Sequence, residues 1–498
     1  MLRSNESAVS GILLGYIASI INYSLAVIYF TVLTRFISLE DYGYYNALLS
    51  IAGIISMFFP TLGIDWAIVR EGAVKYGEGK DPLEHYSALF LISISITMAY
   101  VITLIIITPL YITSVIPERF IGIIYLYILY VIVSAFVNIL SSYLWMIGRF
   151  ATQSLGTLIG GMIFRISEII LIIMFKTVYV IITTMLIGQI FTAFFYFYNV
   201  RKIPILHQGI HILRNNFRKY FSTGIQVWIL SYLGTISTNM SIYLIYMFLG
   251  PSYTGLYTTA NNMVGAVTAL TGSVINVFRS RLAHVYGSGG EVKNLLRDYV
   301  RATVFVTSLL SASAIAVLPA LPFIGIVVGD YVKAIPYGVA LISLSTASSL
   351  SSLYINYLWV LERGWHALEI GVKSLAGYLA SLVVLLIYMR GLGLYTVVIA
   401  GFIGSMIGLM IIFRELGASE IAMETILLWI PSLVSAYIYV SKSILWPVPQ
   451  IIMMLVPAVI GFLRKPLTVS AIDQSPRIFR EILVIFTEKR VDYKKSEI

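Results

Sequence analysis

Charged side chains occur inside stretches of the sequence that are otherwise apolar. Arg165 and Glu168 lie three residues apart in FRISEII, and Lys373 lies within a second apolar run. Residues three apart share one face of a helix, so Arg165 and Glu168 are placed to form an ion pair. Alternatively, Arg165 binds a phosphate group, which its planar fork of donors matches, and Glu168 restrains it. Lys373 is interpreted either as a phosphate contact or as a side chain that extends to the water interface.

A second set of charged residues stands at the ends of apolar runs. Asp65 and Arg70 close one run, Arg279 and Arg281 close another, and Arg35 precedes a polar turn. Such residues commonly cap or anchor helix ends. The functional alternative makes Arg70 and Arg279 contacts for an anionic head group, because arginine binds phosphate in a bidentate manner. Under that alternative, Arg35, Asp65 and Arg281 take part in gating.

Neutral polar residues accompany these charges. Asn22, Asn239 and Asn262 lie in apolar runs beside serines and threonines. Amides and hydroxyls can donate to and accept from the hydroxyls of a sugar. The same residue types also form hydrogen bonds between membrane helices, and the sequence leaves both roles open.

The sequence carries few of the residues that catalysis or metal binding requires. It has no cysteine, which excludes thiol catalysis, disulfides and iron–sulfur clusters. His207 and His211 have a spacing suited to a metal, but no further nearby ligand completes a site. There is no Walker-type nucleotide loop. We therefore expect no catalytic residues, no metal and no cofactor, and a protein that is not an enzyme.

The elements that position these residues are membrane helices. Of the 498 residues, 59% are hydrophobic and only 11% are charged, and the mean hydropathy is +0.91. Apolar runs of roughly 20 residues are long enough to span a bilayer, where each must satisfy its own backbone as a helix. We predict an all-α polytopic membrane protein with about 14 transmembrane helices. Single helices are expected over 43–69 and over 336–361.

The basic residues predict an orientation. If the N-terminus is cytoplasmic, most of the 33 lysines and arginines fall in segments on the cytoplasmic side. Because cytoplasmic loops carry the Lys/Arg excess, both termini are expected in the cytoplasm of a multi-pass plasma-membrane protein. This asymmetry also accounts for most of the net charge of +10, and no motif for reading nucleic acid bases is present. We expect membrane lipids, and no nucleic acid, as partners.

One short polar turn occurs twice in the chain. When Phe36 is aligned with Phe248, the stretches TRFISLEDYGYYNA and FLGPSYTGLYTTANN place Gly43 on Gly255 and Tyr45 on Tyr257. A Tyr-Gly-x-Gly loop then follows in each copy, as KYGEGKD and VYGSGGE. The shared order predicts two parallel six-helix repeats, with two extra C-terminal helices.

These observations predict five segments. They are an N-terminal six-helix bundle over 1–200, a cytoplasmic interfacial linker over 201–218, a C-terminal six-helix bundle over 219–414, helices 13 and 14 over 415–464, and a basic cytoplasmic tail over 465–498.

The repeated motifs resemble a known family. TRFISLEDYGYYNA with FPTLGIDWAIVREGA, and IYLIYMFLGPSYTGLYTTANNM with FRSRLAHVYG, are similar to the polysaccharide flippases (Wzx-like transporters) of the multidrug/oligosaccharidyl-lipid/polysaccharide (MOP) superfamily. The resemblance implies a flippase that moves a lipid-linked oligosaccharide to the outer leaflet by alternating access. It also implies that helices 1, 2, 7 and 8 line a central cavity. We expect a monomer, and the motifs leave open whether an ion gradient drives transport.

Two other functions are weighed against this one. Cation-coupled drug exporters of the same superfamily typically carry acids in helices 1 and 7, whereas 9–33 and 219–247 contain no Asp or Glu. A membrane glycosyltransferase or polymerase would need positioned acid–base or metal-binding groups on an outer loop. The predicted outer loops are short, and their acids do not form a paired-carboxylate site. The flippase is the favoured interpretation.

Overall fold

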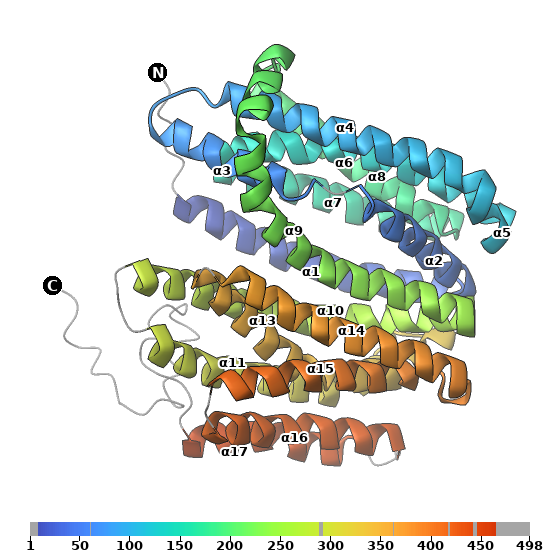
Figure 1. The fold of residues 1–498 in the computed structure, drawn as a ribbon. Coiled ribbons are helices and arrows are strands. Elements are labelled where there is room, and N and C mark those ends of the chain that lie inside the picture. Colours follow the sequence, from blue (N-terminus) through green and yellow to red (C-terminus); the bar gives the residue numbers. More distant parts are fainter. Residues whose placement is uncertain are drawn as a thin grey trace. The chain divides into compact units, whose positions relative to one another are not determined.

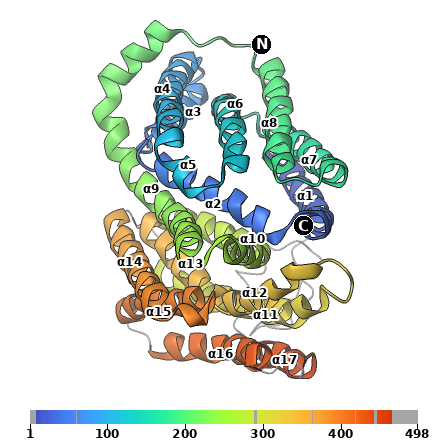
Figure 2. The same cartoon turned by 90° about the vertical axis from the view of Figure 1, so that its right-hand side faces the viewer.

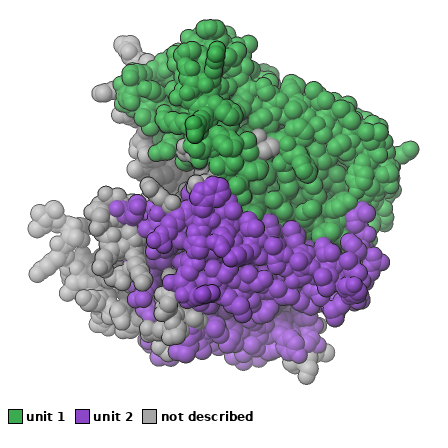
Figure 3. Space-filling model, viewed as in Figure 1, with its two compact units in different colours: residues 1–246, 250–255, 325–329 green, residues 247–249, 256–324, 330–498 purple. Residues whose placement is uncertain are grey.

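A computed structural model of the chain describes residues 8–59, 61–287, 292–361, 363–416, 419–441 and 446–464. Every regular element in these ranges is a helix, which confirms the all-α prediction. The predicted basic tail, 465–498, lies outside the described residues. The chain divides into two compact units, which Figure 3 colours separately. The first comprises Met1–Tyr246, Gly250–Gly255 and Gly325–Gly329, and the second comprises Met247–Leu249, Leu256–Ile324 and Asp330–Ile498.

The first unit is built from helices α1 to α9 and the start of α10 (Figure 1). Their bounds are α1 Ala8–Phe36, α2 Leu39–Ser56, α3 Ile64–Gly77, α4 Leu83–Ile107, α5 Thr113–Val115, α6 Ile121–Met146, α7 Phe150–Phe175, α8 Tyr179–Val200 and α9 Leu206–Leu249. Helix α6 packs against α4 on one side and against α8 on the other (Figure 2). Helix α7 packs against both α1 and α8. These contacts position the polar residues of the site.

The prediction of one continuous helix over 43–69 is wrong. Helix α2 ends at Ser56, and α3 begins at Ile64. Leu62 and Gly63, just before α3, have φ angles of 52° and 70°, in the left-handed region. A right-handed helix cannot run through such a conformation, which costs an L-residue energy. The sequence signal for this break was the proline and glycine of FFPTLG.

The structure gives the backbone conformation of the predicted linker over 201–218, and its interfacial role stays a prediction. Only residues 201–205 are non-helical, and α9 then runs unbroken for 44 residues from Leu206. Pro204 precedes the helix, where its missing N–H breaks no helical hydrogen bond. Most of the basic stretch before position 219 therefore forms the first part of the long helix α9. The first unit contains α9 as far as Tyr246, and the proposed six-helix halves stay a prediction.

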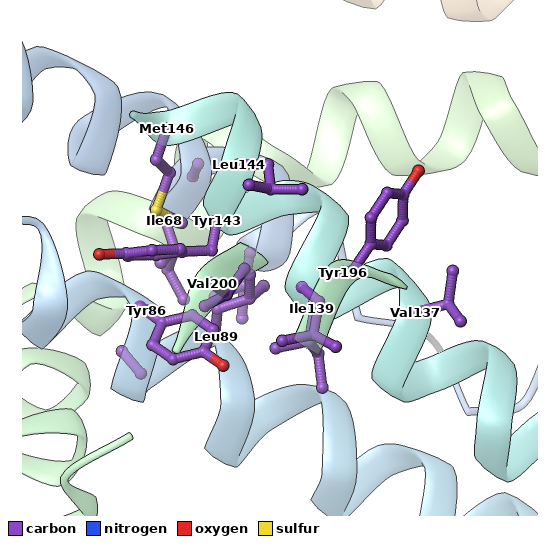
Figure 4. Close-up of a cluster of buried hydrophobic side chains, with 14 of the residues drawn as sticks. Ile68, Tyr86, Leu89, Val137, Ile139, Tyr143, Leu144, Met146, Tyr196 and Val200 are labelled. Atoms are coloured by element: carbon purple, nitrogen blue, oxygen red, sulfur yellow. The ribbon is translucent and has the colours of Figure 1, made fainter. Parts of the chain in front are cut away.

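One hydrophobic core cluster of the first unit lies where α3, α4, α6 and α8 meet (Figure 4). The rings of Tyr86 and Tyr143 pack 4.6 Å apart, centre to centre. Ile68 and Leu144 beside them are completely buried. This packing holds the ends of α3 and α4 against α6 and so fixes the walls of a cavity described below.

The second unit contains α10 from Leu256 onward and α11 to α17. Their bounds are α10 Pro251–Gly287, α11 Val292–Val317, α12 Ile335–Ile342, α13 Ser345–Val360, α14 Gly364–Tyr388, α15 Tyr395–Leu416, α16 Ser419–Ser441 and α17 Val448–Arg464. Helix α11 contacts α13, α16 and α17, and α14 lies along α15.

The expected single helix over 336–361 is wrong as well. It consists of α12 and α13, and the two parts of this span are bent by 47° at a short break. The carbonyl of Ser343, at the break, accepts a hydrogen bond of 2.5 Å from the indole Nε1 of Trp429. A backbone carbonyl released from a helix in an apolar surrounding needs such a partner, which stabilises the bend.

Many of these helices are suited to a bilayer. Within the described residues, eight helices are long and apolar enough to cross a membrane, or nine if the bent pair Gly329–Ile342 and Ser345–Val360 is counted as one span. The chain is therefore a multi-pass membrane protein. The count of about 14 spans stays a prediction, since length and composition alone identify fewer.

Candidate functional site

The charged pair predicted from the sequence forms on α7. Arg165 Nη1 lies 2.6 Å from Glu168 Oε2, and the side chain of Glu168 is fully buried. The Cζ atom of Arg165 also lies 4.7 Å from the centre of the Tyr29 ring and 4.5 Å from that of Phe164. Charge pairing and ring contacts are what an arginine needs in hydrocarbon, because its hydration is lost there. Arg165 and Glu168 thus form the ion pair, while a phosphate contact of Arg165 stays a prediction.

Asn22 lies on the same contact between α1 and α7. A Cβ atom at Gly161 would come within 2.8 Å of Asn22 Oδ1, so glycine allows the amide to approach α7 closely. Gly161 and Arg165 are one helical turn apart and share a face of α7. Asn22 Oδ1 and Glu168 Oε1 are both buried without a hydrogen-bond partner among the described residues. Buried polar atoms of this kind are available to a ligand or to water.

Lys373 is part of a network in the second unit. Its Nζ atom lies 2.5 Å from Glu369 Oε1, and its side chain is 57% exposed. His366 bridges two carboxylates, with Nδ1 3.3 Å from Glu369 Oε2 and Nε2 2.5 Å from Glu415 Oε1. Tyr354 then donates to Glu415 Oε2 at 2.7 Å. The network joins α13, α14 and α15, and only Lys373 among its members was predicted from the sequence.

The residues expected in gating have different surroundings. Arg35 Nη2 donates to the carbonyl of Gly325 at 3.1 Å. Asp65 Oδ1 accepts a hydrogen bond of 2.8 Å from Thr61 Oγ1. Arg70 is exposed, and no ion pair joins it to Asp65 in the described structure. Asp65 is therefore held by a hydroxyl group.

The remaining candidates are scattered. Asn239, on α9, lies so close to α2 that a Cβ atom at Gly53 would be 2.4 Å from its Nδ2 atom. Asn262, on α10, is exposed. The side chains of Arg279 and Arg281 lie outside the described residues.

The two glycines aligned by the sequence repeat meet in the first unit. A Cβ atom at Gly43 would lie 1.9 Å from the carbonyl oxygen of Pro251. A Cβ atom at Gly255 would lie 2.3 Å from the carbonyl oxygen of Leu39. The first turns of α2 and α10 thus cross backbone to backbone, which only glycine permits at this distance. The repeat marked these glycines, but it did not indicate that they touch each other.

Two cavities with both apolar and polar lining residues flank α6 in the first unit. The larger, of about 420 Å³, lies between α3, α4 and α6. Its polar lining consists of Thr61, Asp65, Trp66, Ser93, Thr97, Tyr130, Ser134, Asn138 and Ser142. The second, of about 340 Å³, lies between α6, α7 and α8. Its polar lining consists of Tyr130, Asn138, Ser141, Thr157, Gln189, Thr192 and Tyr196.

Most of these cavity residues were not predicted from the sequence. Four of them, Tyr130, Ser134, Asn138 and Ser142, recur every four residues along α6, in a helix that is otherwise largely apolar. Such a spacing places side chains on one helical face, and it was the available signal. A polar stripe on a membrane helix faces either a neighbouring helix or a hydrated space, and here it faces cavities.

Comparisons with known proteins identify a family and a shared fold. The family model described as "Polysaccharide biosynthesis protein" matches residues 8–278. No curated protein sequence matches the chain.

Solved structures share the fold. The lipid II flippase MurJ in an inward closed conformation matches with a TM-score of 0.65 and 15% identity over 91% of this chain and 98% of that chain. An inward-facing multidrug resistance MATE family transporter of the MOP superfamily matches with a TM-score of 0.62 and 14% identity. The match covers 81% of this chain and 94% of that chain. A third match is a MOP superfamily transporter from Pyrococcus furiosus, whose binding pocket is described as having reverse polarity. It matches with a TM-score of 0.55 and 14% identity, over 82% of this chain and 94% of that chain. The chain therefore belongs to the polysaccharide biosynthesis protein family and has the fold of MOP superfamily transporters.

Proposed function

We propose that this protein is a flippase for an isoprenoid lipid that carries an oligosaccharide through a phosphate or pyrophosphate. It would move the lipid from the cytoplasmic to the outer leaflet for assembly of a surface polysaccharide or glycoprotein. The observation that carries the proposal is the family match over residues 8–278, which spans nearly all of the first unit. The fold shared with a lipid II flippase supports it.

The chemistry of the first unit suits the two parts of such a substrate. Its cavities are lined by hydroxyl and amide groups, which can exchange hydrogen bonds with sugar hydroxyls. Arg165 is the cation at the contact between α1 and α7, and its side chain remains 26% exposed although it is paired with Glu168. In this proposal the exposed edge of the guanidinium attracts the phosphate, and Glu168 keeps the arginine in position.

Transport would proceed by alternating access. The substrate enters from the cytoplasmic side while its isoprenoid tail remains in lipid, and the two repeats then rock to expose the sugar outside. In this mechanism the crossing of Gly43 and Gly255 acts as an outer closure, because both glycines stand next to segments predicted to be external. Releasing a close backbone contact requires no side chain to change its rotamer, which suits a repeated movement.

The setting of this activity is also part of the proposal. We place the protein in the plasma membrane as a monomer with both termini in the cytoplasm, from the distribution of its basic residues. A membrane potential, an ion gradient or consumption of the sugar outside would give the movement its direction. The protein itself would catalyse no covalent step.

The test uses cells depleted of the protein. Lipid-linked oligosaccharides are extracted, and a membrane-impermeant glycosidase or lectin applied to intact cells determines which face holds them. The flippase predicts accumulation on the cytoplasmic face and loss of surface glycan, with recovery when the wild-type chain is supplied. Unchanged amounts on both faces would refute the proposal.

One observation favours a second candidate, an exporter of small molecules. The fold is also that of multidrug MATE transporters, with a TM-score of 0.62. Depletion of an exporter would raise sensitivity to toxic cations and leave lipid-linked sugars unchanged. The same depleted cells therefore distinguish the two functions.

A further inference from the structure

We propose that the cavity between α3, α4 and α6 is a sugar-recognition subsite, in which Asp65 accepts hydrogen bonds from hydroxyls of the transported glycan and Trp66 packs on a sugar ring. This inference rests on the proposed flippase function and identifies the part of the substrate that the first unit reads. The bound group is an uncharged, hydroxyl-rich sugar, and the phosphate binds elsewhere.

The charge of the cavity lining excludes a phosphate site. Asp65 is its one acidic residue, and no lysine, arginine or histidine is among the residues that line it. Phosphate oxygens need cationic or multiple N–H donors, and a carboxylate beside them would repel them. Sugar hydroxyls, in contrast, donate to a carboxylate and accept from serine, threonine and asparagine.

Asp65 has spare capacity as an acceptor. Its Oδ1 atom accepts one hydrogen bond of 2.8 Å, from Thr61. An ionised carboxylate has about four acceptor positions. Asp65 also lies in the first turn of α3, where the helix dipole favours a negative charge. A carboxylate in this position is a strong acceptor for hydroxyl donors.

The α6 wall supplies the complementary groups. Ser134, Asn138 and Ser142 follow one another at intervals of four along one face of the helix and line the cavity. Ser134 Oγ is buried and has no hydrogen-bond partner within the described structure. An unpartnered buried hydroxyl is unfavourable, so a site that fills with sugar hydroxyls or water explains why the position is polar.

The size and the aromatic groups fit one sugar ring. The volume of about 420 Å³ lies in the range of small-molecule sites, roughly 300–1,000 Å³. Trp66 lines this cavity and is 46% exposed, so a broad apolar surface is available to the C–H face of a sugar. Tyr130 and Asn138 line the second cavity too, so the polar surface continues around α6.

The experiment measures two affinities for the full-length protein in lipid nanodiscs. One ligand is the lipid-linked oligosaccharide fraction extracted from the host membrane, and the other is the same fraction trimmed enzymatically to the bare isoprenoid phosphate or pyrophosphate. We expect Asp65→Asn to weaken binding of the glycosylated lipid about tenfold, the effect of losing roughly one charged hydrogen bond. Binding of the trimmed lipid should be unchanged.

Two further variants keep the test decisive. Asp81→Asn is the matched control, because Asp81 lies outside the cavity and pairs with Lys202 on the exposed surface. Trp66→Ala removes the aromatic surface from a side chain that is outside the core, and it should also weaken only the glycosylated lipid. If Asp65→Asn fails to fold, the result with Trp66→Ala decides.

The possible outcomes distinguish a failure of the sugar subsite from a failure of the proposed flippase function. If the wild type binds neither lipid, the proposed flippase function itself fails. If it binds the glycosylated lipid but Asp65→Asn and Trp66→Ala bind it equally well, the subsite is overturned and the flippase remains. If the wild type binds both lipids with the same affinity, no sugar is recognised, and the subsite is overturned again.

Discussion

At the scale of single residues, the pair of Arg165 and Glu168 shows how a charge is kept within an apolar helix. Glu168 is fully buried and Arg165 is 26% exposed, so each depends on the other for compensation. The exposed pair of Lys333 and Asp330, with a similar separation of 2.7 Å, is a natural comparison. Distance alone does not determine what an ion pair contributes, because water competes with exposed partners.

Removing the arginine alone should therefore be costly. We expect Arg165→Ala to destabilise the protein by about 3–5 kcal/mol, since it leaves Glu168 buried without its partner. Adding Glu168→Ala to it should restore part of the loss. Thermal unfolding of the two single variants and the double variant in detergent gives the coupling energy.

The control is the same double-mutant cycle, made with alanine at Lys333 and Asp330. For this exposed pair we expect no measurable coupling energy. Additive effects at Arg165 and Glu168 would contradict the interpretation that the buried carboxylate depends on this arginine.

At the scale of elements, two backbone features organise the first unit. One is the crossing of α2 and α10 at Gly43 and Gly255. The other is the break before α3, where Gly63 has a φ of 70° and approaches Gly224 on α9. In both places a missing side chain allows two segments to touch.

The crossing is tested by adding one methyl group. Gly43→Ala places its Cβ where the carbonyl oxygen of Pro251 would be 1.9 Å away, so the first turns must separate. Overpacking of this kind costs about 1–3 kcal/mol. We expect a lower unfolding temperature and reduced surface glycan in complemented cells.

Gly234→Ala is the control for the crossing, because a Cβ there meets no atom within 4 Å. In a helix it should stabilise the protein by about 0.5–1 kcal/mol. Equal effects of the two substitutions would show that the close approach at Gly43 is unimportant.

The break before α3 has a matched control of its own. Gly63 and Gly148 share a φ of 70°, but a Cβ at Gly63 would lie 2.1 Å from the carbonyl oxygen of Gly224, whereas one at Gly148 meets nothing within 4 Å. Alanine at either position incurs the left-handed backbone cost of about 1–2 kcal/mol. Gly63→Ala should cost more, and the difference in unfolding free energy measures the contact. A larger loss at Gly148 would disprove this assignment.

At the scale of the whole molecule, orientation decides which face receives the substrate. The chain contains no cysteine, so single cysteines can be introduced without altering others. We expect Glu118→Cys to react with a membrane-impermeant maleimide on intact cells. Lys80→Cys should react only after permeabilisation. Both positions are exposed, so accessibility within the protein does not distinguish them. The opposite labelling pattern would place the termini outside.

Short-range features were predictable from the sequence. The spacing of Arg165 and Glu168 indicated an ion pair as one of two alternatives, because residues three apart on a helix are neighbours, and the structure forms this pair. Apolar composition predicted an all-helical membrane protein, since hydrocarbon leaves a backbone few alternatives. The turns around Gly43 and Gly255 indicated the repeat and the family.

The tertiary structure decided which distant residues meet. The contact of Gly43 with Pro251, the cavity that brings Asp65 together with Ser134, and the partners of Lys373 all join segments far apart in the chain or on separate helices. The helix breaks before α3 and within α12–α13 likewise depend on neighbours such as Gly224 and Trp429. Helical periodicity shows which side chains share a face, but the partner of that face depends on how whole helices pack against one another.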